Sequence, residues 1–300
     1  MPNKIFANKR IGILGKGGSG KSTITVLLAS ALREQGYDIF VLDADSTNIG
    51  LHEALGFDKS PDSLIDYFGG ISFSGGKVTC PVDDPTPLPG AAISLEELPG
   101  KYWVEKERLF LLVAGKIGNK GPGAGCDGPI SKITRDLKIQ GIGAHSVTLI
   151  DVKAGLEDSA RGIITSMDWL ITVVDPTYAS IQIAIDIKNL VHQMKAGKTP
   201  STEHLESPEL VERANKIYRE AIVKDSFAVL NKISDKKTEK YLNEQLEKKG
   251  IEPIGTIYKD SSISLSWLEG KPLEGIKANK DIMGVIKRLE QGIKEQQGNL

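Results

Sequence analysis

The chain has 300 residues, of which 40% are hydrophobic and 26% are charged, the balance of an ordinary globular protein in water. Its formal net charge is −1, so no bulk field favours nucleic acid or an anionic membrane as a partner. No apolar run is long enough to span a bilayer, and two cysteines are too few for a disulfide framework. We therefore expect a cytoplasmic protein with no nucleic-acid partner and no stable membrane association.

Short apolar, β-branched runs alternate with longer helical patterns along the chain. The runs are apolar on both faces, as buried parallel strands must be, and their alternation with helices indicates a right-handed parallel sheet covered on both sides. We expect an α/β fold in one domain over residues 1–300, with a mostly parallel, doubly wound sheet and flanking helices. The expected strands are residues 10–15, 38–43, 108–115, 146–151, 169–175, 226–233 and 251–258, and the expected helices are residues 21–35, 129–139, 178–195, 208–223, 236–249 and 279–295.

One region departs from this alternation. Residues 56–105 contain many glycines and prolines and little clear periodicity, so we interpret them as an insertion with short helices, one of them at 63–68. The polar residues 195–207 are expected to form a surface loop.

A glycine-rich stretch, GKGGSGKST at residues 15–23, follows the first expected strand and precedes the first expected helix. It matches G-x-x-x-x-G-K-[ST], in which backbone N–H groups and the start of the helix bind phosphate oxygens. Lys21 is expected to reach the β- and γ-phosphates, Ser22 to bind Mg²⁺ and Thr23 to contact the α-phosphate. The alternative is a glycine-rich turn without a ligand. The predicted nucleotide-binding residues of this loop are Gly15, Gly17, Gly18, Ser19, Gly20, Lys21, Ser22 and Thr23.

Lys16 is a second lysine early in this loop, which reads K-G-G-x-G-K-[ST] from that residue. In this feature the sequence resembles the deviant P-loop of the MinD/ParA/nitrogenase iron protein family of dimeric ATPases. The resemblance implies ATP hydrolysis by a homodimer bridged by nucleotide, in which Lys16 reaches the phosphates of the partner subunit. It also implies slow turnover without a partner protein. The alternative for Lys16 is a solvated loop lysine.

Two carboxylate-bearing segments fit the same resemblance. In VLDADSTNIG (41–50, the first switch), Asp43 and Asp45 point the same way along an extended chain. The resemblance gives Asp45 the role of orienting the attacking water, beside Lys16 and Lys21 as catalytic groups, and places Asp43 in the Mg²⁺ shell. In TLIDVKAGLED (148–158, the second switch), Asp151 would hold Mg²⁺ through water. The alternative for the first pair is two ordinary carboxylates at a strand end.

The base is expected to meet Asn231, in AVLNKI at 228–233, because a side-chain amide offers one donor and one acceptor to a base edge and the resembled family uses such an asparagine for adenine. The choice of ATP over GTP is what the resemblance implies, since the sequence itself only lacks the N-K-x-D pattern, with Ser234 in its fourth position.

Longer stretches narrow the resemblance. DADSTNIGLHEALGF at 43–57, residues 111–130 and residues 151–162 are similar to the CooC group of nickel-handling ATPases, which implies a metalloenzyme client such as carbon monoxide dehydrogenase. That group has a C-x-C pair here, and two subunits bring four thiolates to Ni²⁺ or Zn²⁺.

This chain has Cys126-Asp127-Gly128, so Cys126 is a candidate metal ligand at the dimer interface without a second cysteine. Lys153 stands where the CooC group usually has an acidic residue, and it too departs from the nickel-handling pattern. The alternative for Cys126 is a loop or interface residue that binds no metal.

Other functions stay open at this point. An electron-transfer ATPase with a [4Fe–4S] cluster would need a second cysteine after the second switch, and Cys80 lies in the insertion with no reason to converge with Cys126. A MinD- or ParA-like positioning ATPase would need a membrane-binding tail or a basic patch. The C-terminal apolar stripe is expected to pack on the domain instead; it consists of Ile282, Ile286, Leu289 and Ile293.

Overall fold

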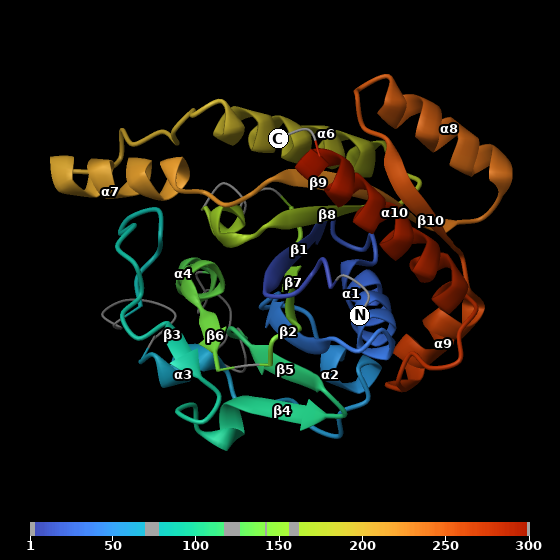
Figure 1. Cartoon of the computed structure of the whole chain (residues 1–300), viewed down its shortest axis with the longest axis horizontal. Helices are drawn as coiled ribbons and strands as arrows, with labels where there is room; N and C mark the ends of the chain where they lie inside the picture. The colour runs from blue at the N-terminus through green and yellow to red at the C-terminus, as the bar shows by residue number, and fades with distance from the viewer. Residues whose placement is uncertain (1–3, 70–77, 117–126, 142, 156–161, 299–300) are drawn as a thin grey trace.

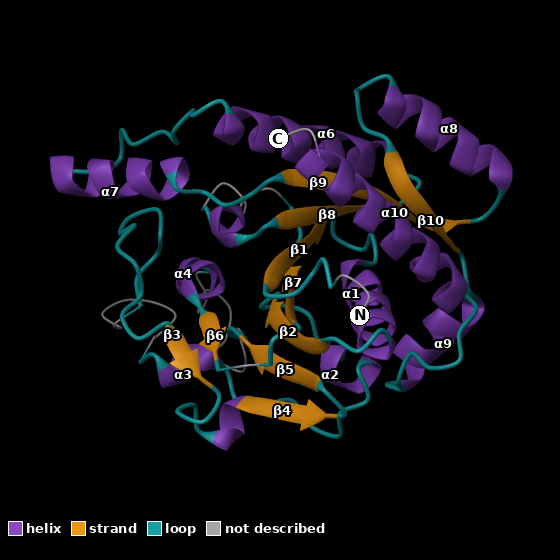
Figure 2. Ribbon diagram, in the orientation of Figure 1, coloured by secondary structure: helices purple, strands orange, loops and turns teal. Residues whose placement is uncertain are grey.

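The computed structural model describes residues 4–69, 78–116, 127–141, 143–155 and 162–298. Within these residues the chain forms an eight-stranded sheet in the order β10-β9-β8-β1-β7-β2-β5-β4 (Figures 1 and 2). Neighbouring strands of this sheet are parallel, except that β4 at one edge is antiparallel to β5. The strands are β1 (Lys9–Gly15), β2 (Asp38–Ala44), β3 (Ala92–Ser94), β4 (Trp103–Lys106), β5 (Leu109–Val113), β6 (Lys138–Gln140), β7 (Ser146–Val152), β8 (Trp169–Val174), β9 (Asp225–Ile233) and β10 (Pro253–Tyr258).

Helices cover both faces of the sheet. Along β2, Ile39 and Val41 join an apolar cluster that includes residues of α1 and α10. Phe40 and Leu42 point to the other face and join a cluster that includes residues of α4 and α6, as strand alternation requires. The helices are α1 (Lys21–Glu34), α2 (Leu51–Ala54), α3 (Leu64–Tyr67), α4 (Gly128–Asp136), α6 (Tyr178–Lys195), α7 (Pro208–Arg219), α8 (Lys236–Glu247), α9 (Ser261–Glu269) and α10 (Ala278–Gly298), with short 3₁₀ turns η1 (Gly100–Tyr102) and η2 (Ile163–Ser166).

The predicted α/β fold with a mostly parallel, doubly wound sheet is confirmed, and each expected strand and helix is present with small shifts of its ends. The helix expected over 129–139 ends at Asp136, because residues 138–140 form β6 and pair with β3. Several elements were not expected: the helices α2 and α9, the edge strand β4 and the short strands β3 and β6. Residues 56–105 contain α3, β3, η1 and most of β4. Their treatment as an insertion within one domain over residues 1–300 stays a prediction.

The parallel order of the sheet brings distant parts of the chain to one edge. The strands β1, β2, β7, β8 and β9 end at this edge (Figure 1). The glycine-rich loop follows β1, and Asp43 in β2 pairs in register with Asp151 in β7. Ligands of open α/β sheets bind outside the carboxyl ends of the strands, so this edge is where a site is expected.

The C-terminal stripe packs as the sequence predicts: the α10 residues Ile282, Ile286, Leu289 and Ile293 are each about 1% exposed within the apolar core. In the part of the chain that the structure describes, no helix combines the length and the apolar character needed to cross a membrane.

Candidate nucleotide-binding site

The glycine-rich loop has the backbone that a phosphate-binding turn requires. It joins β1 to α1, and Gly20 caps the start of α1 with a left-handed φ of 96°. A Cβ atom on Gly20 would clash with the side-chain amide of Asn231, and one on Gly15, at φ 146°, would lie 2.6 Å from the carbonyl oxygen of Val173. Only glycine satisfies both the backbone angle and the space, so this turn can bring its N–H groups and the helix start to a phosphate.

A cleft of about 510 Å³ opens over this loop. The loop, the first switch and α9 line the cleft, Asp45 among them. A second hollow of about 390 Å³ adjoins it, sharing Thr23 and Lys232 and reaching Asn231. The first hollow suits phosphates and the second suits a nucleoside, because the glycines of the loop and Lys21 line only the first.

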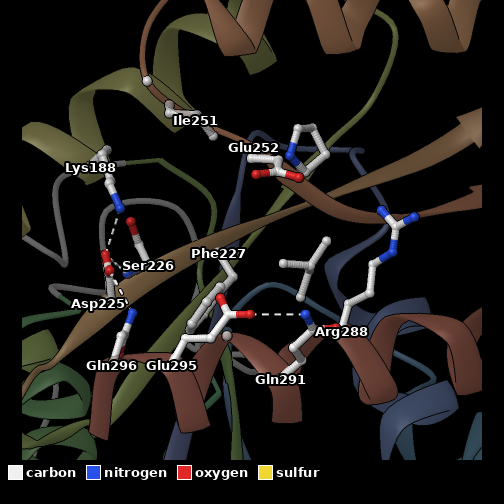
Figure 3. Close-up of a pocket in the computed structure, with 14 residues that line it drawn as sticks. Lys188, Asp225, Ser226, Phe227, Ile251, Glu252, Arg288, Gln291, Glu295 and Gln296 are labelled. Atoms are coloured by element: carbon white, nitrogen blue, oxygen red, sulfur yellow. Dashed lines mark hydrogen bonds and ion pairs between the residues drawn. The ribbon is translucent and has the colours of Figure 1, made fainter. Parts of the chain in front are cut away.

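A larger pocket of about 630 Å³ lies at the amino ends of β9 and β10 (Figure 3). It has no glycine loop among its lining residues, and its carboxylate Asp225 is already paired. Lys188 Nζ lies 2.6 Å from Asp225 Oδ1, and Gln296 donates to Asp225 Oδ2 at 2.7 Å. This pocket is therefore less suited to a nucleotide than the smaller cleft.

Ser22 lines the cleft, and the fully buried Asp151 lies directly behind it. Ser22 Oγ donates to Asp151 Oδ2 at 2.6 Å, and Asn48 Nδ2 donates to Ser22 Oγ at 2.8 Å. Asp151 Oδ1 is buried without a hydrogen-bond partner among the described residues. Burial, followed by the charge of Asp43, raises the pKa of Asp151 to about 7. A hydroxyl beside an unpaired buried carboxylate oxygen is the donor set that Mg²⁺ prefers, so these residues fit the ion.

The expected carboxylates of the first switch are also buried, and Lys116 holds them in a way that the sequence did not predict. Lys116 Nζ lies 2.6 Å from Asp43 Oδ2 and donates to the carbonyl oxygens of Asp45 at 2.6 Å and Asn48 at 2.7 Å. Burial raises the pKa of Asp43 to about 6, although Lys116 opposes the shift. Asp45 Oδ1 accepts from the backbone and hydroxyl of Thr47. Asp43 Oδ1 also accepts from the backbone N–H of Asp45 at 3.2 Å, so both oxygens of Asp43 and one oxygen of Asp45 are already occupied.

Lys16 does not extend freely from the loop. Its Nζ lies 3.3 Å from Asp175 Oδ2, just beyond β8, and its side chain is 30% exposed. Asp175 also accepts a hydrogen bond from Thr177 Oγ1 at 2.6 Å. Its burial is outweighed by hydrogen bonds from Ser180, Thr177 and Lys16, which hold the pKa of Asp175 below its ordinary value. A lysine held at the rim by an anion can exchange that partner for a phosphate.

Asn231 and Lys232 fasten the glycine loop from β9. Asn231, 3% exposed, donates from Nδ2 to the carbonyl oxygen of Ser19 at 2.8 Å. Lys232 has φ 60° and donates from Nζ to the carbonyl oxygen of Gly18 at 2.8 Å. These two bonds occupy the carbonyl oxygens of Ser19 and Gly18 and attach the loop to β9. The predicted contact of Asn231 with adenine stays a prediction.

Residues 13–273 match the family described as the CobQ/CobB/MinD/ParA nucleotide binding domain. The chain belongs to this family. It is 37% identical over 183 residues to an uncharacterized ATP-binding protein of Methanocaldococcus jannaschii, an alignment covering 60% of this chain and 72% of that protein. It is 28% identical over 205 residues to the carbon monoxide dehydrogenase accessory protein CooC of Rhodospirillum rubrum, covering 62% of this chain and 70% of that protein.

Solved MinD structures share the fold. The MinC:MinD cell division protein complex of Aquifex aeolicus gives a TM-score of 0.59 at 18% identity, covering 94% of this chain and 96% of that chain. The septum site-determining protein MinD from Pyrococcus horikoshii, complexed with Mg-ADP, gives 0.56 at 19% identity, covering 96% and 98%. The resemblance to MinD/ParA ATPases with CooC as a relative, and the predicted fold class, are therefore confirmed.

In this member of the CobQ/CobB/MinD/ParA family, α9 contributes a wall that the sequence did not predict. Trp267 Nε1 donates to Thr23 Oγ1 at 3.0 Å. A Cβ atom on Gly50, at the end of the first switch, would lie 3.5 Å from the Trp267 ring. Trp267 thus lies between the glycine loop and the first switch. No periodic apolar face indicated α9, because none of its residues is fully buried.

Replacing Trp267 by Phe keeps a ring but removes the indole N–H. We expect ADP to change the fluorescence of the native protein, since Trp267 contacts Thr23, and the Trp267→Phe variant to lose most of this change. Loss of one neutral hydrogen bond should weaken ADP binding by about fivefold. A fluorescence titration with calorimetric affinities checks both results. A full fluorescence change in the variant would contradict this placement of Trp267.

The buried carboxylates make the stability of the nucleotide-free protein depend on pH. Asp43 and Asp151 have higher pKa values in the folded protein than in the unfolded chain, so their protonation stabilises the fold. This stabilisation is fully present below the pKa of the unfolded chain and is lost as the pH rises through about 6 to 7. Without nucleotide or Mg²⁺, the melting temperature should therefore be lower at about pH 8 than at about pH 5.5. Asp151→Asn should shrink this difference, and calorimetry at both pH values measures it. An unchanged difference in the variant would contradict the burial argument.

The predicted metal ligand Cys126 lies outside the described residues. Among the residues that are described, no three His, Cys, Asp or Glu side chains gather in a group that could hold a metal ion. The expectation that Cys80 does not converge with Cys126 therefore stays a prediction. Cys80 does lie near the described end of this loop, since a Cβ atom on Gly128 would lie 2.7 Å from Cys80 Sγ.

Proposed function

We propose that the chain is an ATPase that dimerises on nucleotide and serves as an accessory factor in the maturation of a metalloenzyme. The observation that carries the ATPase part is the pairing of Ser22 Oγ with Asp151 at 2.6 Å below the glycine loop, with Asp151 Oδ1 unpaired. The family match and a MinD neighbour complexed with Mg-ADP support ATP or ADP with Mg²⁺ as the ligand.

The residues of the cleft divide the chemistry among them. Lys21, buried at the start of α1, would hold the β- and γ-phosphates, while Thr23 would contact the α-phosphate. Ser22 and Asp151 would hold Mg²⁺, with Asp43 in its outer shell, and the ion would offset the charge of the phosphates. These contacts position the triphosphate for attack.

Three further residues would complete the proposed reaction. Asp45, which lines the cleft, would orient the attacking water, and Asn231 would bind adenine. Lys16 would leave Asp175 and reach the phosphates of a second subunit. Because such a site is completed only in the dimer, turnover is expected to be slow until a second subunit, or a client that favours the closed dimer, is present.

The accessory role rests on the similarity to CooC, an accessory protein of carbon monoxide dehydrogenase. The client would be a metalloenzyme of that kind. The proposed cargo is Ni²⁺ or Zn²⁺, bound through Cys126 at the dimer interface. Thiolates suit both ions.

Equilibrium dialysis tests this role with Ni²⁺ and Zn²⁺, each with ADP and with a non-hydrolysable ATP analogue. We expect metal binding that depends on the nucleotide and that Cys126→Ser abolishes. Cys80→Ser shows whether the thiol beside Gly128 contributes. No metal binding in any nucleotide state would contradict the metal-handling role, and would leave the ATPase proposal to be tested by hydrolysis.

A membrane-positioning role has less support. The apolar residues of α10, which could form a membrane-binding stripe, are buried in the core. The structural similarity to MinD is below 20% identity and shows the fold alone. Co-sedimentation with liposomes of anionic lipid in the presence of ATP would revive this alternative.

A further inference from the structure

Asp127 joins the two switches to α4 and, through α4, to residues 78–88 of the insertion, here called the insertion segment. We propose that the nucleotide in the cleft controls the insertion segment through Asp127 and α4. This inference rests on the proposed function, since it assumes that ATP and ADP place the switches differently. It adds the route by which that difference reaches a surface far from the phosphates.

The first step of the route is the carboxylate of Asp127. Ser46 Oγ, in the first switch, donates to Asp127 Oδ1 at 2.5 Å. Lys153, in the second switch, forms an ion pair with Asp127 Oδ2. The second switch also touches the glycine loop, because the backbone N–H of Gly155 donates to the carbonyl oxygen of Gly15 at 3.2 Å. One carboxylate therefore contacts both segments that flank the proposed Mg²⁺ site.

The second step is the start of α4. Asp127 is the N-cap residue of α4, but its side chain accepts no hydrogen bond from the helix. Its carbonyl oxygen accepts from the backbone N–H and the hydroxyl of Ser131, at 2.8 and 2.9 Å. The main chain of Asp127 is thus part of α4, whereas its carboxylate belongs to the switches. A shift of the first switch must therefore move the helix start or break the hydrogen bond from Ser46. A shift of the second switch must move it or break the ion pair with Lys153, in which the lysine side chain is 29% and the aspartate side chain 14% exposed.

The third step is the set of contacts between α4 and the insertion segment. Lys132, only 3% exposed, lies 3.0 Å from Asp84 Oδ2 and 2.9 Å from Thr79 Oγ1. Arg135 donates to the carbonyl oxygen of Pro85 at 3.2 Å. The Asp84 side chain is 35% exposed, but Lys132 is buried, and a buried charge left without its partners is unfavourable. The α4 helix and the insertion segment are therefore expected to move together.

Two further contacts extend this attachment. Asp136 Oδ2 accepts from the backbone N–H of Leu88 at 2.8 Å, and Cys80 lies against Gly128 at the start of α4. Hydrogen bonds from Thr86, Lys132 and Thr79 outweigh desolvation and hold the pKa of Asp84 well below its ordinary value. Asp84 therefore stays ionised across the neutral pH range and keeps its ion pair with Lys132. A continuous series of packed and hydrogen-bonded residues transmits a conformational change when one of its elements has two positions.

Hydrogen–deuterium exchange of the full chain tests the proposal, with Mg-ADP and with a non-hydrolysable Mg-ATP analogue. In the native protein we expect exchange in the peptides covering 79–88 and 128–136 to differ between the two nucleotides. Asp127→Asn keeps the size of the side chain but removes its charge, and should remove most of that difference. Lys153→Met and Ser46→Ala, which alter the partners instead, should each reduce it.

Asp225→Asn is the matched control. Asp225 also accepts from a lysine and a neutral donor, Lys188 and Gln296, but at the other end of the sheet (Figure 3). This variant should keep the native difference. The proposal is overturned if Asp127→Asn keeps the full difference, or if native protein binds the analogue without any change at 79–88. Failure of native protein to bind or hydrolyse ATP would instead overturn the proposed function.

Discussion

Lys21→Ala is expected to lower kcat/KM for Mg-ATP by about 10² to 10³-fold, the usual cost of removing one charge-stabilising group from a preorganised site. Lys21 begins α1 and is buried beside Asp151, where its charge has no easy replacement by water. The loss should fall mainly on kcat, because the phosphate charge that Lys21 neutralises grows as the bond to the leaving group breaks. Phosphate release at saturating ATP measures kcat.

Lys188→Ala is the control for Lys21→Ala. Lys188 is also partly buried and paired with a carboxylate, but it lies in the pocket at the amino ends of β9 and β10 (Figure 3). It should leave hydrolysis near the native rate. If Lys21→Ala hydrolyses ATP as fast as this control does, the glycine loop is not the hydrolytic site.

Lys16→Gln is expected to keep nucleotide binding but to lower kcat by about 10³-fold, at the lower end of what a charged residue supplied in trans contributes. In the isolated chain Lys16 is paired with Asp175 at 3.3 Å, so it must be released before it can act on a second subunit. Binding contacts from the loop backbone, Lys21 and Asn231 do not depend on it. Calorimetry and steady-state hydrolysis separate the two effects.

Mixing subunits tests whether Lys16 acts in trans. A Lys21→Ala subunit keeps Lys16 but has a defective loop, and a Lys16→Gln subunit has the reverse. In a mixed dimer, one site combines an intact loop with the partner's Lys16, so mixing the two inactive variants should restore hydrolysis. If mixing restores nothing although the variants form mixed dimers, Lys16 acts within its own subunit or has no catalytic role.

The sequence predicted the sheet because parallel strands leave a strong local signal. β8 is buried at every residue and reads WLITVV, and the glycine loop has its glycines where φ and space demand them. The helix α9 gave no such signal, because its residues are not fully buried on any face. Its contribution to the site, Trp267, depends on packing against a loop that is 244 residues away in the sequence.

The polar contacts around the motif could not be predicted for a similar reason. Lys116 holds the first switch from about 70 residues away, and Asp127 meets both Ser46 and Lys153. Single charged residues outside a motif give no indication of their partners. Cys80 shows the same limit, since an irregular segment without periodicity carries it back to α4. Spacing therefore predicted which residues line the cleft over the glycine loop, but not what holds them.

We propose above all that the second subunit of a dimer completes the ATPase site. The most direct measurement is the ATP turnover per chain at saturating Mg-ATP, followed over a wide dilution series of the native protein. We predict that turnover per chain rises with protein concentration and levels off once the dimer predominates, and that Lys16→Gln stays low throughout. A turnover per chain that is constant across the dilution series, down to monomer, would contradict the claim.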